Sequence, residues 1–174
     1  MGEPGSGEVS ATVPDWSREK RRQRWDPSRQ LLSAIRSYER WRERWGMIGT
    51  LIVKWQVARH RFWSAVTGAD IQLGTRIGGG LLLTHPNGVV IHAAAEIGVN
   101  CLIFQQVTVG GGGKKPGVPK LGGHVDVGAG AKILGGVVIG DHAKIGANAV
   151  VLDDVPAGAT AVGVPARIIE AKSI

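Results

Sequence analysis

The chain has 174 residues, a formal net charge of +7 and one cysteine, Cys101. That length allows one ordinary core with a small appendage, and a single cysteine excludes an internal disulfide framework and a multi-cysteine zinc site. The start, MGEPGSGEVS, lacks the pattern of a secretory signal, and the longest apolar run, near 47–53, is far shorter than the ~20 residues that span a bilayer. We therefore expect a cytoplasmic protein that does not insert stably into a membrane.

Charge and aromatic residues are distributed unevenly along the chain. Residues 1–69 carry 13 Lys or Arg against 7 Asp or Glu, whereas the remainder carries 8 against 7. All six tryptophans also lie before Gly68, and most of the glycines follow it. The sequence therefore predicts two architectures that meet near Gly68.

The first architecture is predicted to be a short α-helical arm over residues 15–67. Residues 1–14 are rich in Gly, Pro, Ser and Glu, and we expect them to be disordered. The polar run DWSREKRRQR at 15–24 is compatible with a helix; its basic cluster is either a solvated face or a contact for a phosphate-bearing partner, and we expect no nucleic acid. Asp26 and Pro27 then start a helix as its N-cap and first helical residue.

Two apolar helices are predicted within the arm. The first, from about Ser28 to Trp45, presents one apolar stripe and is expected to end at Gly46. The second, about 47–66, is too apolar to remain alone in water. We expect the helices to pack on each other and on the start of the second architecture. Contact with a membrane surface is the alternative for this basic, tryptophan-bearing pair.

Beyond the arm, an apolar residue returns at every sixth position. The pattern is strictest over residues 121–155, where a small or branched apolar residue also stands four positions after each lead. The lead residues are Leu121, Val127, Ile133, Ile139, Ile145 and Val151. Neither a helical period of 3.6 nor the alternation of a strand gives this spacing. It is typical of a parallel β-helix, in which three hexapeptides form one coil and stacked coils bury the leads.

The predicted β-helix covers residues 68–169 and is followed by a tail at 170–174. Its first leads are Ile71, Ile77, Leu83 and Val89, after which the register shifts by two residues to Ile91, Ile97, Ile103 and Val109. The run GGGGKKPGVPK then interrupts the period as a loop at 110–120. Insertions in solenoids collect on the binding face, so this loop points to a site.

Four stretches of this region are distinctive: ADIQLGTRIGGGLLLTHPNGVVI, IFQQVTVGGGGKK, VGAGAKILGGVVIGDHAKIGANAVV and VPAGATAVGVPARII. They resemble serine O-acetyltransferases, a family of hexapeptide-repeat acyltransferases. The resemblance implies a mainly β fold, a left-handed parallel β-helix of hexapeptide repeats with a short N-terminal α-helical arm. It also implies acetyl transfer to L-serine in cysteine biosynthesis, with acetyl-CoA as co-substrate and no permanently bound cofactor.

The resemblance assigns catalytic roles to His85 and Asp70. Transfer of an acetyl group from coenzyme A needs a base for the proton of the acceptor hydroxyl, and an imidazole suits this near neutral pH. His85 would be that base, and Asp70 would hold its tautomer; without the resemblance, a surface histidine is the simpler interpretation. Cys101 occupies an inward small position, so we expect direct transfer rather than an acyl-enzyme.

The resemblance also implies a coenzyme A groove beside the Gly-rich loop. Small residues would let the pantetheine arm approach the backbone or would offer it main-chain hydrogen bonds; they are Gly111, Gly112, Ala129 and Ala147. Lys114, Lys144 and Arg167 are candidates to meet the coenzyme A phosphates, and an exposed solubilising charge is the alternative for each.

The loop departs from the family at the positions that help to hold serine. Gly117 and Val118 stand where the family carries Arg-His before Pro-Lys, and Thr84 replaces the family's Asp beside the catalytic histidine. The loss of these contacts predicts that serine binds weakly and that cysteine inhibits weakly. Asp26 has two interpretations, a helix cap or a carboxylate that contacts the acceptor amine.

Three other functions remain open on the sequence. The first is an O-acetyltransferase whose acceptor is a sugar or polysaccharide hydroxyl. The second is a metal lyase, which would hold zinc with three histidines at a subunit interface; the spacing of His85 and His92 fits that site poorly, and we expect no metal. The third is a non-catalytic binding protein. The resemblance further predicts a homotrimer, and a hexamer is disfavoured because most of the family's helical domain is missing.

Overall fold

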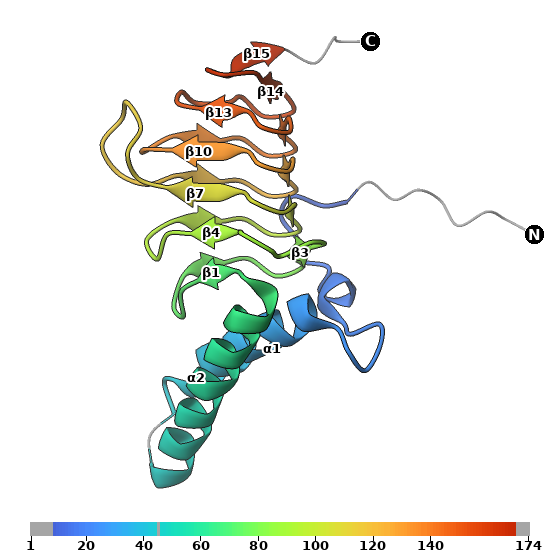
Figure 1. Ribbon diagram of the computed structural model, residues 1–174, viewed down its shortest axis with the longest axis vertical. Helices are drawn as coiled ribbons and strands as arrows, with labels where there is room; N and C mark the ends of the chain where they lie inside the picture. The colour runs from blue at the N-terminus through green and yellow to red at the C-terminus, as the bar shows by residue number, and fades with distance from the viewer. Residues whose placement is uncertain (1–8, 45, 170–174) are drawn as a thin grey trace, which may run out of the picture.

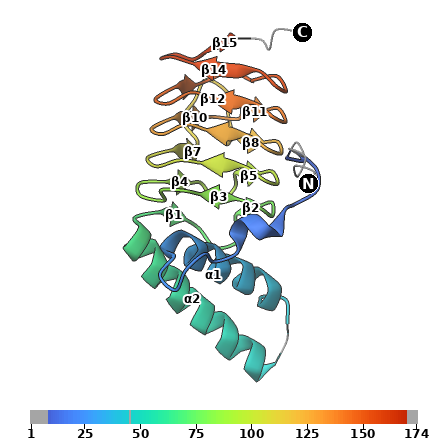
Figure 2. The same cartoon turned by 90° about the vertical axis from the view of Figure 1, so that its right-hand side faces the viewer.

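A β-helix forms the upper part of the molecule and two helices form its lower part (Figure 1). The computed structural model describes residues 9–44 and 46–169. The arm contains a short 3₁₀ helix, η1 (Trp16–Glu19), and two α-helices, α1 (Pro27–Trp41) and α2 (Met47–Thr67). The strands follow as one continuous stack above the arm, and Figure 2 shows the same stack from the side.

Three sheets make the three faces of the β-helix. The first face contains β1 (Asp70–Ile71), β4 (Val90–Ile91), β7 (Thr108–Gly110), β10 (Lys132–Leu134) and β13 (Val150–Val151). The second face contains β2 (Arg76–Ile77), β5 (Glu96–Ile97), β8 (Lys120–Leu121) and β11 (Val138–Ile139). The third face contains β3 (Leu82–Leu83), β6 (Leu102–Ile103), β9 (Asp126–Val127), β12 (Lys144–Ile145), β14 (Thr160–Val162) and β15 (Arg167–Ile169). Neighbouring strands are parallel except for β14 and β15. The predicted β-helix is therefore confirmed.

The lead residues form the core of this stack. On the first face, Ile71, Ile91, Val109, Ile133 and Val151 lie above one another and are at most 1% exposed. The small partners are buried at the corners beside them, where a larger side chain would meet the neighbouring coil. No single coil could bury these side chains, so the stacking itself supplies the hydrophobic stabilisation.

The register shift lies in a different place from the one predicted. Ile71 pairs with Ile91 and Leu83 pairs with Ile103, so the lead after Leu83 is Ile91, and the extra residues fall in the turn at 84–88. Val89 is buried, but it occupies the corner position two residues before a lead, and its assignment as a lead was wrong. The hexapeptide pattern did not distinguish the two registers, because an apolar valine suits both a lead position and a corner position.

The arm closes the lower end of the β-helix. Leu31, Leu32 and Ile35 of α1 are at most 1% exposed and belong to the same apolar cluster as the first coil. On α2, Nε2 of His60 lies 2.7 Å from the carbonyl oxygen of Ile71. The expected packing of the helices on each other and on the first coil is therefore confirmed.

Two details of the helices differ from the prediction. α1 ends at Trp41, earlier than expected, and Gly46 precedes α2 with a φ of 111° instead of ending α1. One side of α2 also remains uncovered, with Ile48 and Trp55 exposed by 70% and 64%. The shorter α1 has 15 residues against 21 in α2, so it covers only part of that helix.

The segment before η1 lies against the β-helix instead of being disordered throughout. Asn100, which is 1% exposed, donates hydrogen bonds to the carbonyl oxygens of Ser10 and Val13 and accepts one from the amide of Asp15. Residues 1–8 and the predicted tail at 170–174 lie outside the described residues. The polar run at 15–24 forms only η1, which the side chain of Asp15 caps by accepting from the amide of Ser17.

A charged junction ties η1 and α1 to the first coil. The Glu19 carboxylate accepts from the amides of Gly80 and Leu81 and pairs with Arg36 at 2.9 Å. Arg36 also donates to the carbonyl oxygens of Ile77 and Gly78, each at 2.6 Å. These groups satisfy backbone atoms at the open end of the coil, which would otherwise be buried without partners.

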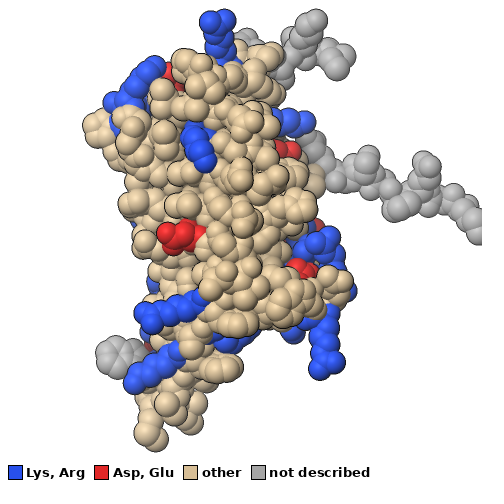
Figure 3. Space-filling model, in the orientation of Figure 1, with Lys and Arg blue, Asp and Glu red and all other residues tan. Residues whose placement is uncertain are grey.

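Basic side chains gather over the arm in the view of Figure 3, with others near the far end of the stack. Within the part of the chain that the structure describes, neither helix combines the length and the apolar character that crossing a membrane requires.

Candidate active site

His85 lies in the turn that joins the third face to the first face. This turn, residues 84–88, carries the two extra residues between β3 and β4 and therefore projects from the corner. Backbone hydrogen bonds hold it between coils, because Gly88 donates to Gly68 and Asn87 accepts from Gln106. Gly88 has a φ of 67°, a conformation that favours glycine. The His85 side chain is exposed on this turn.

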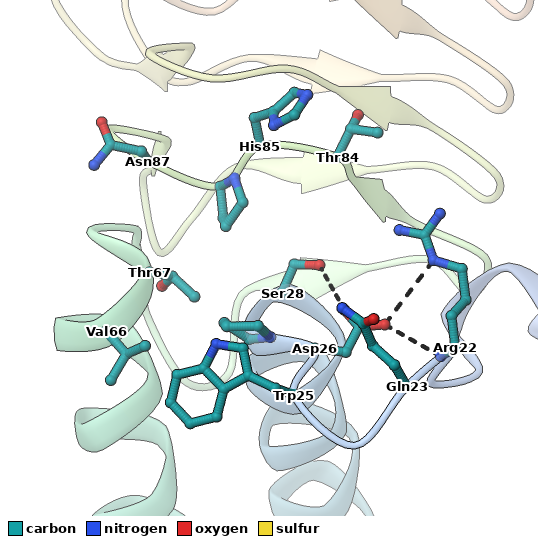
Figure 4. Close-up of a pocket in the computed structure, with 12 residues that line it drawn as sticks. Arg22, Gln23, Trp25, Asp26, Ser28, Val66, Thr67, Thr84, His85 and Asn87 are labelled. Atoms are coloured by element: carbon teal, nitrogen blue, oxygen red, sulfur yellow. Dashed lines mark hydrogen bonds and ion pairs between the residues drawn. The ribbon is translucent and has the colours of Figure 1, made fainter.

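A pocket of about 680 Å³ lies between the arm and the His85 turn. Its lining comes from residues 22–23 and 25–28 before and at the start of α1, from the end of α2 at 66–67 and from the turn at 84–87. Figure 4 shows Trp25, Asp26 and Ser28 below the turn and the His85 imidazole above it, pointing away from the arm. His85 therefore lies where the pocket meets the upper coils.

Asp26 is the buried acid of this pocket. It occupies the N-cap position of α1, but its side chain makes no capping hydrogen bond. Its carboxylate accepts from the amide of Arg22 and lies 3.5 Å from Arg29, and Oγ of Ser28 donates to it. The carboxylate therefore contacts side chains of the first turn of α1 and is also part of the pocket lining. Its contact with an acceptor stays a prediction.

Asp70 lies on the first face, outside the lining of the pocket. It is exposed at the start of β1 and pairs in the sheet with Val90. It is not among the residues that line the pocket, and within the described residues no hydrogen bond joins it to His85. His85 and Asp26 line the same pocket, and the role of Asp70 stays a prediction.

The seven candidate coenzyme A residues fall into two groups on different corners. Ala129 and Ala147 occupy turns of the same corner as His85, between the third and first faces, and Lys144 and Arg167 lie on the third face nearby. Asn148 donates to the carbonyl of Ala129. The amides of Ala129 and Ala147 make no backbone hydrogen bond within residues 9–44 and 46–169, so both can donate to a ligand.

The second group lies on the loop between β7 and β8, which leaves the corner between the first and second faces. Gly111 and Gly112 are exposed there, and no atom lies within 4 Å of where a Cβ of Gly112 would stand. Lys114 pairs with Asp153 at 2.9 Å, and the neighbouring Lys115 pairs with Asp154 at 2.7 Å. The whole first face separates these residues from Ala129 and Ala147 of the same chain (Figure 1).

Cys101 is buried as predicted. It is 0% exposed, its thiol donates to the carbonyl oxygen of Gly122, and burial raises its pKa to about 11. A thiol in this state is a poor nucleophile near neutral pH. Its assignment to the core is confirmed.

The other candidate histidines lie away from the pocket. His92 follows β4 and accepts from the amide of Ala94, whereas His85 precedes the same strand, so the two occupy different corners. His124 and His142 stack on neighbouring coils with their Nδ1 atoms 2.9 Å apart. Among the residues described, no group of three or more His, Cys, Asp or Glu is placed to hold a metal ion.

Arg22 is a pocket residue that the sequence did not single out. It was predicted only as part of a basic cluster, yet its guanidinium lies over the pocket, 4.0 Å from the carboxylate of Asp26. The available signal was its spacing, because it precedes Asp26 by four positions.

Comparison with known proteins identifies the type of β-helix. The model of the family "Bacterial transferase hexapeptide (six repeats)" matches residues 119–153. A serine acetyltransferase of Synechococcus elongatus is 50% identical over 106 residues, which are 60% of this chain and 43% of that protein. The β-helix of this chain is similar to those of the hexapeptide-repeat serine acetyltransferases. The resemblance seen in the sequence is confirmed.

Two solved structures extend the comparison to the arm. Soybean serine acetyltransferase complexed with serine superposes with a TM-score of 0.69 and 41% identity, over 82% of this chain and 57% of that one. The enzyme of Brucella abortus strain S19 in complex with coenzyme A gives a TM-score of 0.70 and 33% identity, over 84% and 57%. The chain thus spans little more than half the length of these relatives.

Proposed function

We propose that this protein is an acetyl-CoA-dependent serine O-acetyltransferase with His85 as the general base. The observation that carries the proposal is the position of His85, between a pocket that holds a buried acid and a corner that offers free amides. The relatives solved with serine and with coenzyme A support the two substrates.

The reaction follows from these positions. The imidazole of His85 accepts the proton of the acceptor hydroxyl while that oxygen attacks the thioester carbonyl. The tetrahedral intermediate then collapses, the carbon–sulfur bond breaks, and the imidazolium returns the proton to the coenzyme A thiolate. No covalent enzyme intermediate is needed. Asp26 pairs with the acceptor ammonium, and Asp70 is proposed to hold the tautomer of the His85 imidazole and to stabilise the imidazolium.

The corner arrangement supports a homotrimer as the working unit. Gly111, Gly112 and Lys114 lie across the first face from Ala129 and Ala147, so one coenzyme A molecule reaches both groups only if they come from two chains. A second chain would bring its loop beside the free amides of the first. We expect a trimer by light scattering at micromolar concentration, and a monomer with full activity would contradict this arrangement.

A cytoplasmic location is part of the same proposal. The only cysteine is a buried, unpaired thiol, which suits a reducing compartment.

The test of the function is consumption of acetyl-CoA by the purified protein with L-serine, L-homoserine and a panel of sugars. We expect saturable turnover with L-serine. Saturation by a sugar with serine inert would support the polysaccharide alternative, which the missing cations at Gly117 and Val118 allow. Absence of turnover with every acceptor would favour a binding protein.

A further inference from the structure

Two guanidinium groups lie close to the one carboxylate of the pocket beside His85, although Arg22 lines the pocket and Arg29 does not. The acid of the pocket, Asp26, already has a fixed partner, because Arg29 lies 3.5 Å away and both side chains are 8% exposed. Arg22 adds a second cation at the same carboxylate. One carboxylate therefore faces two guanidinium groups, and the site has one positive charge in excess.

Arg22 is the cation that can take another partner. Its Nε lies 4.0 Å from Asp26, at the limit of an ion pair, and its side chain is 68% exposed. Only its backbone amide, and not its guanidinium, makes a hydrogen bond within the described residues. A guanidinium in this state presents its full set of donors to a ligand, and its planar fork matches a carboxylate.

Among residues 9–44 and 46–169, no other Lys or Arg lines the pocket, and the other ionisable lining groups are Asp26 and His85. The Gly-rich loop cannot help from the same chain, because Gly117 and Val118 lie on a different corner and carry no charge.

From these positions we propose that Arg22 binds the carboxylate of the acceptor. The inference rests on the proposed transferase function and narrows its substrate to a hydroxy amino acid. The carboxylate pairs with Arg22, the ammonium with Asp26, and the hydroxyl is left to reach His85. A neutral sugar would leave the excess charge of Arg22 without a partner. Arg22 thus replaces the contacts that the Gly-rich loop lacks at Gly117 and Val118. It raises the affinity for serine above the weak affinity that the loop alone predicts.

The decisive experiment compares two variants on two acceptors. Arg22→Gln removes the proposed contact, and Arg24→Gln removes an exposed positive charge two residues away that does not line the pocket. The acceptors are L-serine and serinol, which keeps the amine and hydroxyl but has no carboxylate. We expect Arg22→Gln to raise the KM for L-serine about ten- to a hundredfold, the size of one charged hydrogen bond, with little change in kcat.

The expected pattern is specific to the carboxylate. The KM for serinol should stay within about twofold in Arg22→Gln, Arg24→Gln should resemble the wild type on both acceptors, and Arg22→Lys should recover part of the loss. An equal rise for L-serine and serinol would show a merely structural role, and an unchanged KM for L-serine would also overturn the proposal.

Binding measured without acetyl-CoA separates this inference from the proposed function. Calorimetry of L-serine with wild type and Arg22→Gln reports the carboxylate contact even if no transfer occurs. Arg22-dependent binding with no turnover would reject the transferase but keep the carboxylate site. Normal serine turnover and binding in Arg22→Gln would keep the transferase and reject Arg22.

Discussion

The β-helix and the arm differ in how their residues specify the structure. In the β-helix one rule is repeated, so that each inward position holds an apolar residue and each corner holds a small one, and neighbouring coils are nearly interchangeable. In the arm, individual polar pairs fix the structure, as Glu19 with Arg36 and Asp26 with Arg29 do. The repeated part supplies a rigid stack, and the irregular part supplies most of the pocket lining. The difference suggests that the fold and the acceptor specificity can change separately.

Loss of His85 should have the largest effect, and it should lower the rate of the chemical step without changing assembly or acetyl-CoA binding. We expect His85→Ala to lower kcat by about two to four orders of magnitude, the usual contribution of a general base, with the trimer and acetyl-CoA binding intact. His92→Ala is the matched control, because His92 is also exposed beside β4 but lies on another corner. Activity of His85→Ala within about threefold of wild type would remove His85 as the base.

A core substitution in the β-helix should cost far more stability than one on the open side of α2. Ile133 is 0% exposed, so Ile133→Ala should lower the free energy of unfolding by about 2–5 kcal/mol through lost burial and a cavity. Leu51 is 61% exposed, and Leu51→Ala should change it by less than about 0.5 kcal/mol. Denaturant unfolding measures both. A large loss in Leu51→Ala would mean that the exposed side of α2 is covered by another chain.

The charged junction of Glu19 and Arg36 between the two regions should make an intermediate contribution to the free energy of unfolding. Glu19→Gln keeps the shape but leaves Arg36, which is 15% exposed, without its closest carboxylate. We expect a loss of about 1–3 kcal/mol, as for other hydrogen bonds to charged groups. Hydrogen exchange should show the loss first in α1. Glu43→Gln, at a side chain that is 80% exposed, should be neutral; equal effects of the two variants would contradict the junction.

The sequence predicted the repeated region far better than the irregular one. A six-residue period has a single structural solution, so the strands and the core could be assigned from spacing alone. The register at Val89 was wrong because an apolar residue fits either a lead or a corner. The ordered segment at 9–14 depends on contacts with the distant Asn100, and no local pattern encodes such contacts. Arg22 was missed although its partner Asp26 is only four residues away. The roles assigned to Asp70 and to the coenzyme A residues rest on the resemblance and remain predictions.

The smallest expected effect concerns the anchoring of the Gly-rich loop to the β-helix. Hydrogen bonds from Lys115 and from the amide of Val138 lower the pKa of Asp154 below its usual value of 3.8. Since the folded-state pKa is depressed, the contact is present above the ordinary pKa and is lost as the pH falls through the lowered one. The amide resonance of Val138 should therefore titrate with a midpoint below 3.8, and Lys115→Ala should move that midpoint upward. Added salt should act in the same direction, because both side chains are exposed and their attraction is screened. If neither Lys115→Ala nor salt changes the midpoint, the loop is held by its backbone contacts and not by charge. One such contact is the hydrogen bond from the amide of Gly136 to the carbonyl of Lys115.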